Sequence, residues 1–297
     1  MNEAFRYPDF YHIGAYKSAS TSLHYYLSQH PQIYMARQKG GNYLAFAGKD
    51  SNSPRQFGQK IIREKDYQNL FSGYSGEKMV GESSPHYLAS DQALERIHKL
   101  RPDARLIVIL RNPVEAIYSR YLMRRRDGGI TQPFSELLDS EEQVLAGNSG
   151  RSRLHLDTAF YGHWLDKYYQ RFPAEQIKVQ LYDDYLQNRA AQLHELFTFL
   201  GVDPSFSPHN QRSYNRSGIP RTRWLQLIMK YRRSLQPLVK RIVPTGARAR
   251  IMDKLTNGLE KPSLEQRERQ RLVDIYREDI LRLEKLLQRD LQHWLGE

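Results

Sequence analysis

The residues that are able to do chemistry gather first around Lys17, in a run of small and hydroxylated residues that reads Lys-Ser-Ala-Ser-Thr-Ser. Apolar residues from 10 to 14 predict a strand before this run, and leucine and tyrosine side chains at helical spacing follow it up to residue 27. A helix that begins beside a lysine and several hydroxyls offers free backbone N–H groups and its positive dipole end to an anion. The segment 10–27 therefore predicts a strand, an anion-binding turn and a helix, and we expect the anion to be a phosphate.

The spacing within this turn separates it from the nucleoside triphosphate loop of kinase-like enzymes. That loop needs Gly-x-x-x-x-Gly-Lys-Ser/Thr, so that the lysine follows the turn and the next hydroxyl holds magnesium. Here Lys17 follows Gly14 too early, and Ala19-Ser20 stand where the second glycine and the lysine belong. A P-loop kinase-like enzyme is therefore an alternative that the spacing opposes. The structural alternative is an ordinary strand-to-helix turn with one exposed lysine.

A second phosphate site is predicted after the clearest strand, residues 105–110, whose apolar run is typical of a central parallel strand buried on both faces. Asn112 and Pro113 suit the start of the next helix. Arg111 leaves the strand, and Ser119 follows eight residues later on the polar side of that helix. The two side chains can face one point and together suit a phosphate. The alternatives are a strand-end salt bridge for Arg111 and a solvated position for Ser119.

Both segments resemble the motifs of sulfotransferases that use 3′-phosphoadenosine 5′-phosphosulfate (PAPS), of the bacterial type and similar to glycan and heparan-type domains. Residues 17–23 match the phosphosulfate loop Lys-x-Gly/Ala-Thr/Ser-Thr-x-Leu, and Arg111 with Ser119 matches the pair that holds the 3′-phosphate. The resemblance implies a metal-independent transferase that moves a sulfuryl group from PAPS to a hydroxyl or amine and releases adenosine 3′,5′-bisphosphate (PAP). The PAPS contacts that it implies in the first turn are Lys17, Ser18, Ala19, Ser20, Thr21 and Ser22.

Further PAPS contacts follow from the order of segments in this family. A strand is predicted over residues 176–186. The resemblance implies that Tyr182 in this strand approaches the adenine; its alternative is a half-buried strand residue. A basic turn at 214–221 stands where relatives close a late loop over the 3′-phosphate, which points to Arg216 and Arg221. The Gly-x-x-Gly-x-x-Lys form of the cytosolic branch is absent from that turn.

The resemblance also implies which residues take part in the reaction. Lys17 is expected at the bridging oxygen of the leaving phosphate, where a cation stabilises the transition state more than the ground state. A general base must take the acceptor's proton, and glycan-modifying relatives often place a glutamate where this chain has Gly40. Glu82 is the expected replacement and His86 the second candidate, because an imidazole titrates near neutral pH. The alternatives are a structural carboxylate for Glu82 and a packed or surface imidazole for His86.

Charge is concentrated in one stretch of the chain. Of a net charge of +12, the segment 211–254 contributes +11. Such a segment suits an anionic cofactor or acceptor, peripheral membrane contact through 224–254, or merely a solvated helix face. The rival function is a non-catalytic basic module that binds nucleic acid or a membrane surface. That rival leaves the Lys17 and Arg111 motifs unexplained, so we expect no nucleic-acid partner.

The amino-acid composition limits which other classes of protein are possible. The chain has no cysteine, which excludes disulfides, cysteine nucleophiles and cysteine-bound metals. Its ten histidines show no close ligand pair, so no metal is expected. There is no apolar run near 18 residues and no signal-peptide pattern at the start, and we expect a soluble, cytoplasmic protein.

The pattern of elements predicts a three-layer α/β fold with a central, mostly parallel sheet and a helical C-terminal third. We expect one domain over residues 1–297, with an α/β cofactor-binding core at 8–217 and a basic helical extension at 218–297. The last helix begins at a capping box at Ser263 and carries one apolar stripe from Tyr276 to Trp294. Loops at 37–60 and 124–155 are expected to set the acceptor. A glycan, a lipid and a small metabolite all fit, and the sequence indicates neither the acceptor nor the oligomeric state.

Overall fold

The computed structural model describes residues 5–48, 61–150, 152–209, 218–220, 259–260 and 262–296. The predicted binding residues Arg216 and Arg221, and the basic segment 224–254, lie outside these ranges. The chain divides into two compact units. The sheet unit comprises residues 1–112, 157–214 and 276–297, and the second unit comprises 113–156 and 215–275. The predicted single domain, divided near residue 217, stays a prediction.

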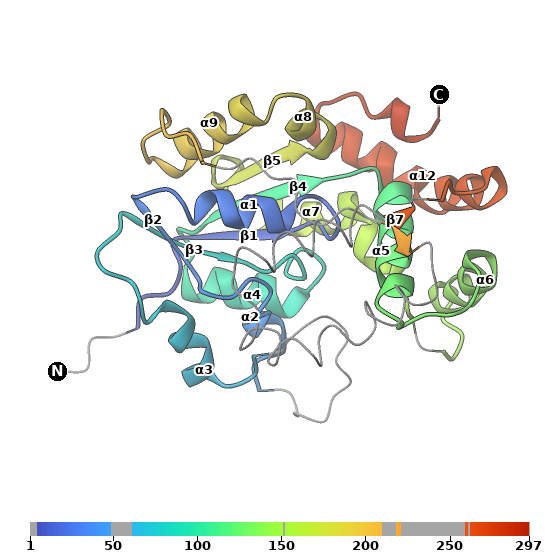
Figure 1. Ribbon diagram of the computed structural model, residues 1–297, viewed down its shortest axis with the longest axis horizontal. Helices are drawn as coiled ribbons and strands as arrows, with labels where there is room; N and C mark the ends of the chain where they lie inside the picture. The colour runs from blue at the N-terminus through green and yellow to red at the C-terminus, as the bar shows by residue number, and fades with distance from the viewer. Residues whose placement is uncertain are drawn as a thin grey trace. The chain divides into compact units, whose positions relative to one another are not determined.

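The sheet unit is built on five strands in the order β2-β3-β1-β4-β5 (Figure 1). All neighbouring strands are parallel, so their C-terminal ends meet at one edge, which we call the strand-end edge. The predicted strands at 10–14 and 105–110 are confirmed, and the second is an inner strand whose residues 106–110 are completely buried. The strand bounds are β1 Phe10–Gly14, β2 Ile33–Met35, β3 Met79–Ser83, β4 Arg105–Leu110 and β5 Ile177–Leu181.

The register between β1 and β3 decides which side chains share a face of the sheet. Tyr11 lies beside Glu82, and His12 lies beside Ser83. Because side chains alternate along a strand, His12 and Ser83 point to one face and Glu82 points to the other. One residue earlier, Phe10 lies beside Gly81, where an added Cβ would come within 2.1 Å of the phenyl ring. The glycine is therefore required by the close approach of that ring.

Helices cover both faces, which confirms the three-layer architecture. Helices α1 (Ser20–Leu27) and α9 (Arg189–Leu200) pack with Phe10 and Ile107 in one apolar cluster. Figure 1 shows α4 (Asp91–Leu100) on the side of the sheet opposite α9. The remaining helices of the sheet unit are α2 Tyr43–Phe46, α3 Glu64–Gln68, α7 Tyr161–Tyr169, α8 Tyr182–Gln187 and the 3₁₀ turns Asn69–Phe71, Ala174–Gln176 and Gln292–Trp294. A further 3₁₀ turn, Leu156–Ala159, crosses the division between the units. Within the described ranges, no helix is both long and apolar enough to cross a membrane.

Three sequence predictions about these elements are wrong. The strand expected to run past residue 182 ends at Leu181, and α8 begins at Tyr182. The segment expected as a polar loop from 37 contains α2, whose apolar side chains at 44–46 are buried. The last helix, α12 (Gln266–Leu287), begins after Ser263 and ends at Leu287, so the stripe expected up to Trp294 is not continuous. Gln288 has a positive φ of 51°, and Trp294 is buried from the turn that follows.

The C-terminal part of α12 packs closely on α7 within the sheet unit. Asp279 accepts hydrogen bonds of 2.8 Å from the backbone N–H groups of Gly162 and His163, in the first turn of α7. A Cβ on Gly162 would lie 2.6 Å from the carbonyl oxygen of Asp279. A carboxylate at a helix N-terminus satisfies donors that have no intrahelical partner, so Asp279 fixes the two helices to each other.

The second unit contains α5 (Pro113–Arg126), α6 (Phe134–Leu145) and the antiparallel pair β6 (Ile219–Pro220) and β7 (Leu259–Glu260). The sequence predicts that α5 packs on one side only, and this is wrong. Even Arg120 is buried, because its guanidinium donates to the carbonyl oxygens of Leu154 and His155 at 2.5 and 3.1 Å. Ser119 is likewise 1% exposed rather than solvated.

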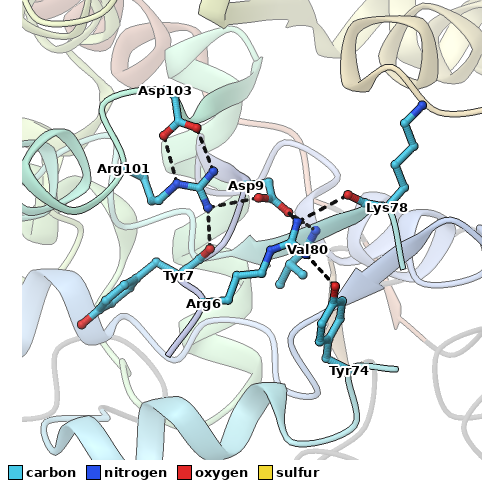
Figure 2. A network of polar contacts seen from close by, with 8 residues as sticks. All are labelled: Arg6, Tyr7, Asp9, Tyr74, Lys78, Val80, Arg101 and Asp103. Carbon is cyan, nitrogen blue, oxygen red and sulfur yellow. Dashed lines mark hydrogen bonds and ion pairs between the residues drawn. The ribbon is translucent and has the colours of Figure 1, made fainter. Parts of the chain in front are cut away.

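At the opposite ends of the strands, a network of charges ties the start of β1 to β3 and β4 (Figure 2). Asp9, just before β1, accepts from Arg6 at 2.6 Å and from the backbone N–H of Val80 at 2.7 Å. Arg101 donates to Asp9 at 3.0 Å and to both oxygens of Asp103. The Asp9 side chain is 12% exposed, whereas that of Asp103 is 70% exposed. Asp9 is therefore the shared acceptor of the network.

We expect Asp9→Ala to lower the free energy of unfolding by about 2–4 kcal/mol, because it leaves a backbone N–H of β3 and two guanidinium groups without their acceptor. Asp103→Ala is the matched control and should cost at most about 1 kcal/mol, because an exposed ion pair contributes little. Urea unfolding of the two variants measures the difference. Equal losses would contradict the role of Asp9.

Candidate active site

The strand-end edge brings together predicted site residues that are far apart in the sequence. Lys17 follows β1, Glu82 and His86 lie at the end of β3 and just after it, Arg111 follows β4, and Tyr182 follows β5. All five belong to the sheet unit. Loops at this edge of a parallel sheet are the usual place for ligands in α/β proteins, so the topology supports the location predicted from the motifs.

The turn between β1 and α1 has an unusual backbone. Lys17 and Ala19 both have positive φ values, 65° and 58°, although neither is glycine. Such left-handed residues each carry a cost of about 1 kcal/mol and cluster at functional sites. Serine side chains support the shape of the turn. Ser18 is completely buried, and the hydroxyl of Ser22 donates to the carbonyl oxygen of Ala19 at 3.2 Å. The turn is thus held in a strained shape at the N-terminus of α1, where an anion is stabilised.

Arg111 joins the first turn to the ends of two other strands. Its Nη1 donates to the carbonyl oxygen of Lys17 at 3.2 Å. Its guanidinium carbon lies 4.9 Å from the ring centroid of Tyr182, a cation–π distance. The backbone carbonyl of Lys17, the guanidinium of Arg111 and the ring of Tyr182, which follow β1, β4 and β5, therefore lie together at the strand-end edge. Tyr182 is half-buried at the first position of α8, instead of within a strand.

Three other contacts with the 3′-phosphate stay predictions. Ser119 belongs to the second unit, and its position relative to Arg111 stays a prediction. Arg216 and Arg221 lie outside the described residues.

Glu82 occupies a closed environment of hydroxyl groups. Its carboxylate is completely buried and accepts from Tyr67 at 2.8 Å, and from Ser84 and Tyr87 at 2.6 Å each. Burial raises the pKa of Glu82, and the three hydroxyl donors oppose that rise. With both oxygens occupied and no exposed surface, the carboxylate matches the structural alternative. Its assignment as general base stays a prediction, and this geometry opposes it.

The Glu82 network also holds the segment that follows β2. The hydroxyl of Ser84 accepts from the backbone N–H of Asn42 at 3.1 Å, and that of Tyr87 accepts from Leu44 N–H at 3.1 Å. The N–H of Gly40 donates to the carbonyl oxygen of Ser83 at 2.8 Å. Residues 39–46 are thus fastened to the end of β3, and Glu82 orients the hydroxyls that fasten them.

His86, the second candidate base, is packed between aromatic rings. Its imidazole stacks on Phe46 with centroids 5.0 Å apart and planes 8° apart, and Tyr16 lies 6.1 Å away. His86 is only 9% exposed. These contacts match the packed-imidazole alternative, and a catalytic role for His86 stays untested.

The sequence reasoning missed a cluster on the opposite face from Glu82. His12, on β1, is completely buried and shares a 2.8 Å hydrogen bond between its Nδ1 and the hydroxyl of Ser83. Burial and the nearby charge of Lys39 lower the pKa of His12 to about 3 and that of His24, on α1, to about 4. Burial also lowers the pKa of Lys39 to about 8. A histidine in an otherwise apolar strand was the available signal for this cluster.

Among the described residues, no group of three or more histidine or acidic side chains is placed to hold a metal ion.

We expect Glu82→Ala to lower the free energy of unfolding by about 3 kcal/mol or more, because three buried hydroxyls lose their acceptor. Glu82→Gln keeps an oxygen acceptor and should cost less. Because the pKa of Glu82 is raised in the folded state, its contribution is present below the unfolded value of about 4.3 and is lost as pH rises through the folded value. Urea unfolding against pH should lack this decline in Glu82→Gln and retain it in the exposed control Glu95→Gln; an unchanged profile would contradict the burial argument.

Comparison with known proteins places the chain in one family. A model of the sulfotransferase family matches residues 8–208. The human protein "Bifunctional heparan sulfate N-deacetylase/N-sulfotransferase 2" is 25% identical over 98% of this chain, which corresponds to 31% of its own length. The "Membrane-associated sulfotransferase kil1" of Dictyostelium discoideum is 26% identical over 70% of this chain and 40% of its own. The chain therefore spans about a third of the length of the curated relatives it matches.

A solved structure agrees with these relatives. A sulfotransferase from Alicyclobacillus acidocaldarius aligns over 97% of this chain and 99% of its own, with a TM-score of 0.72 and 27% identity. The family model alone covers more than half of the chain, and the matched residues include Lys17, Arg111 and Tyr182. The resemblance seen in the two motifs is thus confirmed, and the chain belongs to the sulfotransferase family.

Proposed function

We propose that this chain transfers a sulfuryl group from PAPS to a hydroxyl or amine acceptor. The observation that carries the proposal is the position of Arg111, whose guanidinium binds the Lys17 carbonyl and lies over Tyr182. PAPS has two phosphate ends and an adenine. The Lys17 turn suits one phosphate end, Arg111 suits the other, and the ring of Tyr182 suits the adenine. Membership of the sulfotransferase family supports the same donor.

These contacts assign a role in PAPS binding to the groups that follow β1, β4 and β5. The Lys17 turn and the N-terminus of α1 hold the 5′-phosphosulfate, because the first N–H groups of a helix lack intrahelical partners and attract an anion. Arg111 holds the 3′-phosphate, for which a guanidinium is well suited. Tyr182 offers its half-buried ring to the adenine. Ser119, Arg216 and Arg221 complete the 3′-phosphate site in this proposal.

The reaction then needs no covalent enzyme intermediate. A lone pair of the acceptor attacks sulfur, the bond between sulfur and the bridging phosphate oxygen breaks, and PAP leaves with the developing negative charge. Lys17 is placed on the turn that holds this phosphate, and its ammonium stabilises the charge as it forms. The acceptor's proton must go to a base.

The acceptor class that we propose to test first is a glycan amine or hydroxyl. It is supported by the human relative, whose name assigns it to heparan sulfate N-sulfation. Cytoplasmic location and membrane contact through 224–254 remain predictions.

We expect PAP to raise the melting temperature of the protein by several degrees at about 100 times its Kd, because a ligand that binds only the folded state stabilises it by about 2.7 kcal/mol at that ratio. Arg111→Ala should abolish most of this shift. Arg105→Ala is the matched control, since Arg105 lies at the other end of β4 over Phe199, and it should retain the shift. Adenosine 5′-monophosphate, which lacks the 3′-phosphate, should stabilise less than PAP. No shift at millimolar PAP would overturn the proposal.

We expect Lys17→Met to lower the rate of sulfuryl transfer by about 100- to 1,000-fold, because one preorganised charge at the reacting group has that effect. The assay measures PAP release from PAPS with a heparan-type oligosaccharide that carries free amines. Lys65→Met, on the exposed helix α3, is the control and should keep the wild-type rate. A wild-type rate in Lys17→Met would exclude Lys17 from the mechanism, whereas a PAP-binding protein with no transfer to this glycan would contradict only the acceptor class.

A further inference from the structure

The chain after α12 comes back to a loop that carries one of the proposed PAPS contacts. Helix α12 ends at Leu287, and residues 289–295, which we call the post-α12 segment, lie beside α8 (Figure 1). The side-chain amide of Asn112 donates to the carbonyl oxygen of Trp294 at 3.2 Å. Asn112 directly follows Arg111, and all of these residues belong to the sheet unit. The post-α12 segment therefore contacts the loop from which Arg111 extends.

Hydrogen bonds to Glu284, near the end of α12, give the post-α12 segment a fixed shape. The carboxylate of Glu284 accepts from the backbone N–H of Leu291 at 2.8 Å and from the side-chain amide of Gln292 at 3.0 and 3.2 Å. Leu291 is completely buried, and Trp294 is 2% exposed. The Trp294 N–H also donates to the carbonyl oxygen of Leu291 at 2.8 Å. The Trp294 carbonyl thus reaches Asn112 from a buried, hydrogen-bonded turn.

Asn112 lies where the loop after β4 needs an anchor. Strand β4 is completely buried up to Leu110, and Asn112 is the last residue of the sheet unit before α5. Arg111 lies between them, so β4 holds its backbone on one side and the post-α12 segment, through Asn112, holds it on the other. A fixed backbone limits the directions of the guanidinium, which donates to the Lys17 carbonyl and lies over the Tyr182 ring.

A second contact of the post-α12 segment is weaker. Arg289 donates at 2.6 Å to Asp184 on α8, two residues after Tyr182. The side chains of this ion pair are 46% and 32% exposed, and an ion pair in contact with water contributes little to stability. By contrast, the hydrogen bond to Asn112 comes from the buried residue Trp294. The loop after β4 is therefore held more firmly than α8.

We infer that Asn112 is a positioning residue for the 3′-phosphate of PAP. Held by the Trp294 carbonyl, it fixes the backbone from which the Arg111 guanidinium reaches this phosphate. The inference rests on the PAP binding proposed above. A guanidinium binds a phosphate through parallel N–H groups, so its affinity depends on direction as well as on charge. The post-α12 segment thereby contributes to the preference for a nucleotide with a 3′-phosphate over one without it.

Asn112→Ala tests this role without adding a charge near the phosphate. Isothermal titration calorimetry measures the affinities of the protein for PAP and for adenosine 5′-monophosphate, which lacks the 3′-phosphate. The affinity for PAP should fall about 5- to 10-fold, the scale of one hydrogen bond, and that for adenosine 5′-monophosphate should change much less. The ratio of the two affinities depends on the 3′-phosphate site and not on overall stability. An unchanged ratio would overturn the proposal.

A remote variant and a matched control separate positioning from general destabilisation. Glu284→Ala removes the acceptor of the Leu291 N–H and the Gln292 amide, and it should lower the affinity ratio about 2- to 5-fold. Asp279→Ala, on the same helix, breaks the contact with α7 instead, and it should lower the melting temperature but leave the ratio unchanged. An equal fall of the ratio in Asp279→Ala, or no fall in Glu284→Ala, would contradict the role of the post-α12 segment.

A double variant shows whether Asn112 acts through Arg111. In the Arg111→Ala background, Asn112→Ala should lower the affinity for PAP much less than it does in the wild type, because the group that it positions is already gone. An equal fall in both backgrounds would show that Asn112 acts by itself and would overturn the positioning role.

The same measurements distinguish this inference from the proposal on which it rests. A wild-type protein that binds PAP no more tightly than adenosine 5′-monophosphate would contradict the proposed 3′-phosphate site. A wild-type preference for PAP that survives undiminished in Asn112→Ala would contradict only the positioning role of Asn112.

Discussion

All five strands of the sheet run in the same direction, and the site depends on this constraint. Parallel pairing brings the C-terminal end of every strand to one edge, so that residues as distant as Lys17 and Tyr182 share one small region. Arg111 connects the ends of three strands, because its guanidinium donates to the Lys17 carbonyl and lies over the Tyr182 ring. The network around Asp9 secures the opposite ends of three of the strands, which keeps their register fixed.

The order of the strands also separates two groups of residues at the strand-end edge. The ends of β1, β4 and β5 hold the groups suited to a donor with two phosphate ends, and the ends of β3 and β2 hold the segment that carries Lys39. Two faces of β3 serve different purposes. Glu82, on one face, orients the hydroxyls that fasten residues 39–46, and Ser83, on the other, binds His12 beside Lys39. A buried carboxylate thus helps to hold residues 39–46 at the end of β3.

The sequence predicts the donor half of the site well, because that half is local. Lys17 and the hydroxylated residues after it are contiguous in the sequence, and the strand at 105–110 is an uninterrupted apolar run. The strands at 10–14 and 105–110 and the helix after Lys17 are therefore predicted correctly. Glu82 was harder to assign, because its environment is made by Tyr67 and Tyr87, which reach it only after the chain has folded. The lowered pKa of Lys39 could not be predicted, because it arises from burial in the folded chain. For α5, the helical pattern was correct, but its burial on nearly all sides depends on carbonyl acceptors more than 30 residues away.

A crystal structure of the protein with PAP tests the central claim most directly. The account predicts that the 5′-phosphate lies in the Lys17 turn at the N-terminus of α1, that the 3′-phosphate contacts Arg111, and that the adenine lies against Tyr182. PAP bound away from this edge, or bound with its two phosphates exchanged between Lys17 and Arg111, would contradict it.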